Sequence, residues 1–183
     1  MGEKFALPEK IYGEDIKLLR RQLGMTQKEF AELMRVSKAT VVHWENTEKE
    51  ISGPVILALK MLRENPDLTA ELSIPEQKLP LRLYYYYKNI LCTLIDVDDG
   101  TMRVQIKNYT RNVQYRAFGV NMEPTYEDYQ TFLESRCFPR SRDKVKLELK
   151  RLGLPFYDPL MIVEKTEGRM AEDDFRLLVE RRH

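Results

Sequence analysis

Residues 24–46 constrain the fold of this chain more than any other stretch, because two helix starts follow each other closely there. Thr26 and Glu29 have the spacing of a capping box, in which the hydroxyl accepts from the third amide of a helix and the carboxylate caps in return. This helix has room for about two turns before Ser37, which can cap a second helix over residues 38–45. The sequence therefore predicts two short helices separated by a tight turn.

The second of these helices has two different sides. Val41 and Trp44 lie three residues apart, so both face inward in a helix. The opposite side carries small, polar and basic groups and no acidic side chain. Two short helices at a steep angle, with such a side facing outward, predict a helix-turn-helix that fits the major groove of DNA. The outward residues are Lys38, Ala39 and His43.

The spacing of several residues in this stretch is that of a known family: Gln27, Ala31, Val36, Ser37, Thr40, Val41, Trp44 and Glu45. In these positions the stretch resembles the helix-turn-helix of phage repressors and Xre-type regulators. That family usually has glycine in the turn, where this chain has Met34 and Arg35. A residue other than glycine at positive φ costs roughly 1 kcal/mol, which leaves open a turn of different construction. The alternative interpretation is a small helical bundle without DNA.

The resemblance implies roles for individual residues. It implies phosphate contacts by Gln27 and Ser37, and a DNA backbone contact by Asn46 just past the recognition helix. It also implies base contacts by the outward residues of the second helix, with double-stranded DNA as the partner. The predicted DNA-binding set is Gln27, Ser37, Lys38, Ala39, Thr40, His43 and Asn46.

A change in pattern predicts two domains. Residues 1–65 form an all-α helix-turn-helix domain, in which Ile16, Leu19 and Leu23 belong to a first helix and Pro54 begins a fourth. The inner face of that fourth helix is predicted to consist of Val55, Ala58, Leu59 and Leu62. A proline-punctuated linker follows over residues 66–80, and an α+β domain over residues 81–183.

The second domain begins with a small antiparallel sheet. Period-2 alternation predicts a three-stranded meander with one buried face, formed by residues 81–97, 102–107 and 113–117. Asp98, Asp99 and Gly100 supply the first turn. Helices are predicted from Thr125, over residues 142–152 up to Gly153, and from Asp158 to Gly168, followed by a last strand at residues 175–179.

Basic residues gather between Arg136 and Arg151. On a helix, Arg142, Lys146 and Lys150 fall at successive i+4 steps, where like charges cost a few tenths of a kcal/mol per pair. The candidates for a second nucleic-acid surface or a protein-docking surface are Arg140, Arg142, Lys146 and Lys150. A solvated charged face is the alternative.

Other chemistry-bearing residues receive structural interpretations. The run Tyr84–Tyr87 could stack single-stranded bases, but core and cross-strand packing explains it more simply. The acidic groups Asp96, Asp98 and Asp99, and Glu172–Asp174, are expected to be solvated rather than metal-binding, and Cys92 and Cys137 to be buried thiols. No catalytic constellation, cofactor site or metal site is recognised. No signal peptide or membrane-spanning run is recognised either, so a cytoplasmic protein is expected.

Parts of the second domain resemble a module that is joined to Xre-type domains in proteins of phages and mobile elements. The similar stretches are residues 136–143, 152–159 and 165–174. The two resemblances together imply a sequence-specific, homodimeric transcription regulator of a phage or mobile element. The alternative is an anti-CRISPR protein that inhibits an RNA-guided CRISPR nuclease through its C-terminal domain, by analogy with phage proteins of similar construction.

Overall fold

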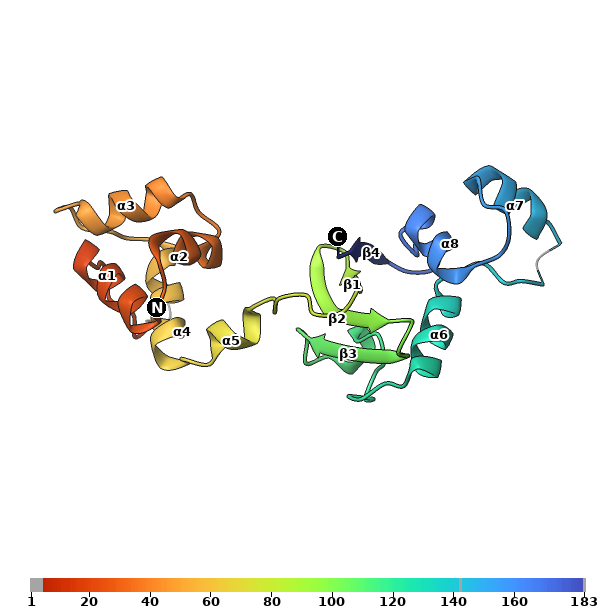
Figure 1. Cartoon of the computed structure of the whole chain (residues 1–183). Coiled ribbons are helices and arrows are strands. Elements are labelled where there is room, and N and C mark those ends of the chain that lie inside the picture. Colours follow the sequence, from red (N-terminus) through yellow and green to blue (C-terminus); the bar gives the residue numbers. More distant parts are fainter. Residues whose placement is uncertain (1–4, 142, 183) are drawn as a thin grey trace. The chain divides into compact units, whose positions relative to one another are not determined.

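The computed structural model describes residues 5–141 and 143–182. The chain divides into two compact units, Met1–Ile74 and Pro75–His183, and each is described by itself. Among the described residues, no helix is long and apolar enough to cross a membrane. The fold is a helical N-terminal region followed by a region that combines a small antiparallel sheet with helices, as the sequence predicts (Figure 1).

The described residues of the N-terminal unit form five helices: α1 (Gly13–Gln22), α2 (Gln27–Met34), α3 (Lys38–Asn46), α4 (Pro54–Glu64) and α5 (Leu68–Leu72). The predicted caps are confirmed. Thr26 and Glu29 form the capping box of α2, and the Ser37 side chain caps α3. Local hydrogen bonds thus set both helix starts of the motif.

One hydrophobic core holds the first four helices together. Phe30 of α2 and Val41 of α3 are fully buried, together with Ile16 of α1. Trp44 packs against this core at its edge, which confirms the predicted inward face of α3. In α4, Ile56 is buried in place of the predicted Ala58, which is only half-buried.

In the described part of the C-terminal unit, four antiparallel strands form one sheet in the order β3-β2-β1-β4. The strands are β1 (Leu81–Tyr87), β2 (Ile90–Asp98), β3 (Arg103–Asn108) and β4 (Phe175–Arg181). The other elements are the 3-10 turn η1 (Val113–Tyr115) and the helices α6 (Tyr126–Ser135), α7 (Val145–Leu152) and α8 (Pro159–Thr166). Side chains of all three helices join the core on one face of the sheet.

Two strand predictions are wrong. Residues 81–97 form two strands, because Lys88 takes a left-handed conformation with φ 52° and reverses the chain after β1. Residues 113–117 form the turn η1 instead of a strand, and β4 supplies the outer partner of β1. The run 81–97 has apolar residues on both sides because β1 and β2 are the two interior strands of the sheet.

The helix predictions for this unit are confirmed, with α7 beginning three residues later than predicted, at Val145. Thr125 and Asp128 form the capping box of α6, Gly153 ends α7 at φ 71°, and Asp158 caps α8.

The four tyrosines of β1 alternate between the two faces of the sheet. Tyr85 is buried in the core and stacks on Phe175 with ring centroids 4.9 Å apart. Tyr87 stacks on Tyr115 of η1 at 4.4 Å. Packing therefore accounts for these two rings, as the simpler interpretation predicts. Cys92 and Cys137 are buried free thiols, as expected, and burial raises the pKa of Cys137 to about 12.

The expectation that the acidic groups are solvated is wrong for Asp96, whereas Asp173 is exposed but held in an ion pair. Asp96 is buried, and its carboxylate accepts hydrogen bonds from Nε (2.6 Å) and Nη2 (2.7 Å) of the buried Arg82. Asp173 accepts from Nη1 of Arg136 at 2.6 Å. Arg136 begins the run of basic residues, but its guanidinium is buried and also donates to the carbonyl oxygen of Gly168. Burial of each arginine requires an acidic partner.

Candidate nucleic-acid interface

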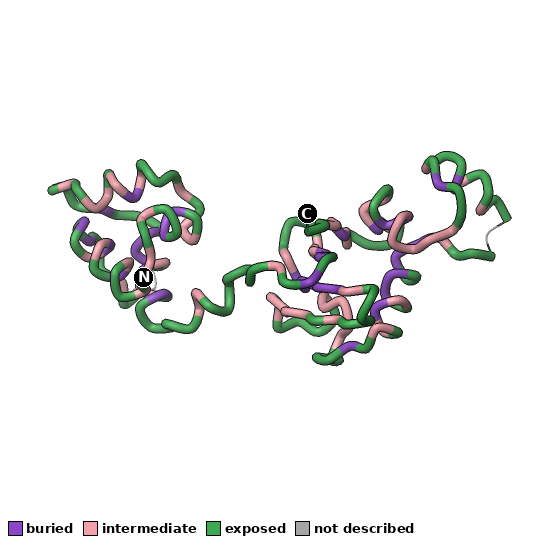
Figure 2. The backbone as a smooth tube through the Cα atoms, in the orientation of Figure 1, coloured by how far each residue is buried: buried purple, intermediate pink, exposed green. Residues whose placement is uncertain are grey.

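Helix α3 presents one side to the core and the other to solvent. Val41 is fully buried, whereas Lys38, Ala39 and His43 are exposed. Figure 2 shows buried, intermediate and exposed positions following one another along α3. These three residues lie on the side that the sequence predicts for base contacts. The exposed side carries no carboxylate, so it is free of groups that would repel DNA.

The turn between α2 and α3 keeps the left-handed conformation without a glycine. Arg35 adopts φ 55° and ψ 39°, and its amide donates to the carbonyl groups of Ala31 and Glu32. The amide of Val36 also donates to the carbonyl oxygen of Ala31, at 3.0 Å. The turn is thus built with the usual geometry, at the cost of roughly 1 kcal/mol for a side chain at positive φ.

Ser37 and Thr40 share a hydrogen-bond arrangement at the start of α3. The Ser37 hydroxyl accepts from the Thr40 amide at 3.0 Å, and the two hydroxyl oxygens lie 2.8 Å apart. Asn46, at the other end of the helix, donates through Nδ2 to the carbonyl oxygen of Val42 at 2.9 Å. Both ends of α3 are therefore held by the predicted DNA-contacting side chains themselves.

A buried ion pair joins the three helices behind this surface. Arg20 of α1 donates to Glu45 of α3 through Nε (2.5 Å) and Nη2 (3.0 Å), and through Nη1 to the carbonyl oxygen of Met25. The Glu45 side chain is only 3% exposed. The Arg20 hydrogen bond lowers the pKa of Glu45 against the opposing effect of burial. The Nε2 amide of Gln27 donates to the same carboxylate at 2.8 Å.

This network fixes Gln27 at the first position of α2 and orients α3 relative to α1. The sequence predicts a phosphate contact for Gln27, and it reveals neither the partner Glu45 nor the role of Arg20. An acidic residue next to the inward-facing Trp44 was the available signal that a basic partner lies inside the motif.

The second candidate surface is only partly described. Lys146 and Lys150 are exposed on α7, and Arg142 lies outside the described residues. Arg140 pairs with Glu134 at 2.9 Å and covers the Tyr157 ring at 4.8 Å from its centroid. Arg140 thus already has an acidic and an aromatic neighbour within its own unit.

Residues 16–70 match the family model of the helix-turn-helix, of the Xre-like type that the sequence resembles. The match contains the whole of α2 and α3 and does not extend into the C-terminal unit. No curated protein and no solved structure shows a significant match to the chain. The helix-turn-helix region supports DNA binding and a role in transcription regulation.

Proposed function

We propose that the protein is a sequence-specific regulator that binds double-stranded DNA through α3. The observation that carries this proposal is the exposed, carboxylate-free side of a helix whose opposite side is locked into the core by Val41. Lys38 and His43 offer hydrogen bonds to base edges, and Ala39 offers an apolar contact to a thymine methyl group.

Phosphate contacts would orient α3 in the groove. The Gln27 side-chain amide has two hydrogens, and the bond to Glu45 uses one, so the other is free to donate to a phosphate. Gln27 also begins α2, where helix amide groups favour an anion. The whole chain has a net charge of only +1, so affinity for random DNA should be weak and specificity should rest on few contacts.

Substitution on α3 should change both affinity and base preference. Lys38→Ala or His43→Ala is expected to weaken binding to the selected site by about 1–3 kcal/mol and relax preference at one position. Gln27→Ala should weaken all sequences alike. Selection from random duplex DNA, followed by titration of each variant, measures these effects. Enrichment of no motif by the wild-type protein would refute sequence-specific binding.

We also propose that the regulator binds as a homodimer, because one recognition helix with three base-reading residues is too small for tight specific binding. Two-fold symmetry would place half-sites roughly 34–36 Å apart. The selected motif should therefore be an inverted repeat, and light scattering at micromolar concentration should return twice the chain mass of 21.7 kDa. A monomer mass together with a motif that has no symmetry would contradict the proposal.

The origin in a phage or mobile element, and the alternative function of inhibiting an RNA-guided CRISPR nuclease, stay predictions from the sequence. The exposed Lys146 and Lys150 are the part of the supposed docking surface that remains open to a partner. Arg140 is less suited to that role because Glu134 already neutralises it.

A further inference from the structure

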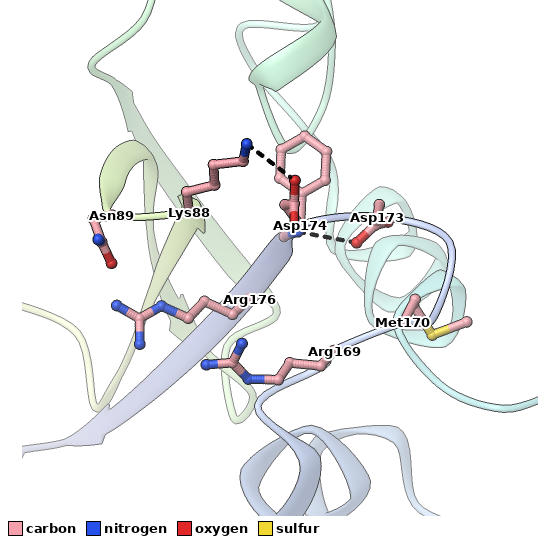
Figure 3. A pocket seen from close by; sticks show the side chains of 8 residues that line it. Lys88, Asn89, Arg169, Met170, Asp173, Asp174 and Arg176 are labelled. Atoms are coloured by element: carbon pink, nitrogen blue, oxygen red, sulfur yellow. Dashed lines mark hydrogen bonds and ion pairs between the residues drawn. The ribbon is translucent and has the colours of Figure 1, made fainter.

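A small polar pocket opens beside the turn that joins β1 and β2 (Figure 3). Its volume is about 240 Å³. Two segments distant in sequence form it, namely the turn residues Lys88 and Asn89 and the segment 169–176 that leads into β4. In Figure 3 the guanidinium groups of Arg169 and Arg176 end on the same side of the pocket, and the Lys88 ammonium turns to Asp174.

Both carboxylates of the pocket already have basic partners. Asp173 is held by the buried Arg136, which lowers the pKa of Asp173 through its hydrogen bonds. Asp174 pairs with Lys88 at 3.4 Å. Arg169 binds Glu167 through Nε and Nη2, so its Nη1 group is the part left to face a ligand. The acidic residues therefore do not neutralise every cation around the pocket.

Among the described residues around the pocket, Arg176 is the cation without an ion pair. No ion pair of Arg176 occurs among the residues that the structure describes, and its Nε is buried without a hydrogen-bond acceptor. The guanidinium lies over the Tyr86 ring, 5.1 Å from the centroid, which holds it in place on the sheet. A ligand cannot reach the covered Nε, so Arg176 would bind one through its terminal Nη1 and Nη2 groups, which carry a charge that no carboxylate of the described residues balances.

We propose that this pocket binds the phosphate group of a small molecule. Arg176 and Arg169 would donate to its oxygens, and the Asn89 side chain and Lys88 would add donors from the opposite segment. Donors from two segments suit a tetrahedral dianion better than a planar carboxylate, which one guanidinium can satisfy in bidentate fashion. The volume lies below the roughly 300–1,000 Å³ typical of drug-sized ligands, which fits a phosphate with a small attached group.

Calorimetric titration of the full chain tests the proposal. The probes are inorganic phosphate, adenosine monophosphate and, as the carboxylate comparison, acetate, all at constant ionic strength. Both phosphates should bind saturably at millimolar concentration or below, and acetate should not. Arg176→Gln should weaken phosphate binding about tenfold or more, and Arg169→Gln should weaken it in the same direction. Tighter binding of adenosine monophosphate than of inorganic phosphate would identify a phosphomonoester as the ligand. Equal binding of the two would show that the pocket recognises the phosphate group alone.

Arg103→Gln is the matched control, because it removes the same charge from an exposed arginine of β3 outside the pocket. Its phosphate affinity should equal that of the wild type. Circular dichroism checks that each variant is folded, and Arg169→Gln decides the outcome if Arg176→Gln unfolds. The proposal is overturned if neither phosphate binds, if acetate binds as well, or if the control loses as much affinity as the folded pocket variants.

Discussion

Replacing Gly13 with alanine is expected to lower the free energy of unfolding of the N-terminal unit by about 2–3 kcal/mol. Helix propensity alone predicts the opposite, since alanine favours a helix over glycine by about 1 kcal/mol. Gly13 is the buried first residue of α1, and a Cβ there would overlap the carbonyl oxygen of Trp44 and lie 3.1 Å from the carbonyl group of Glu45. Main chain cannot yield as a flexible side chain can, so α1 and α3 would have to separate.

Denaturant unfolding monitored by tryptophan fluorescence measures this effect. Trp44 is the single tryptophan of the chain, so the signal reports on the N-terminal unit. Gly24→Ala is the control. The space around that Cβ is open, and only the left-handed backbone at φ 69° opposes the change, at roughly 1 kcal/mol. Equal losses for the two variants would show that the close approach of α1 to α3 does not limit stability. Specific DNA affinity should fall in Gly13→Ala alone, because α3 carries the DNA-contacting residues that we propose.

Local signals predicted most helix bounds correctly. Thr26, Ser37, Thr125 and Asp158 each cap a helix at the position where the sequence places the cap. Caps act over three or four residues, so they can be recognised without knowledge of the tertiary structure. The exposed side of α3 could be predicted for the same reason, because helical periodicity separates it from the buried side.

The sheet and the ion pairs were harder to predict. The turn between β1 and β2 falls at Lys88 and Asn89, without a glycine or proline, inside a run that is apolar on both sides. Such a run lacks the alternation of apolar and polar residues, so no break in a pattern marks the position of the turn. The pairs of Arg82 with Asp96 and of Arg136 with Asp173 join different elements of the fold. Only the tertiary fold brings these side chains together, so the sequence alone does not show that Asp96 is buried or that Asp173 has a basic partner.

The ion pair between Arg20 and Glu45 leads to the second large effect. Glu45→Ala is expected to lower the free energy of unfolding of the N-terminal unit by about 3 kcal/mol, because it leaves the largely buried Arg20 guanidinium without its carboxylate. Glu32→Ala is the matched control. The Glu32 side chain is 67% exposed, and its Oε1 lies 3.9 Å from Nζ of Lys28 on α2. An exposed ion pair of this kind stabilises a protein by about 0–1 kcal/mol. Similar losses in the two variants would contradict a structural role for the buried pair.

The same pair should make the stability of this unit depend on pH. Arg20 lowers the pKa of Glu45 in the folded state, so the folded protein binds fewer protons than the unfolded chain as the pH falls. The stabilisation is complete above the unfolded pKa of about 4.3 and is lost as the pH falls through the lower folded value. Trp44 fluorescence should therefore show a steep loss of stability below about pH 4.5 in the wild type and in Glu32→Ala. The loss should be shallower in Glu45→Ala, and an equal slope in all three proteins would show that other groups cause the acid dependence.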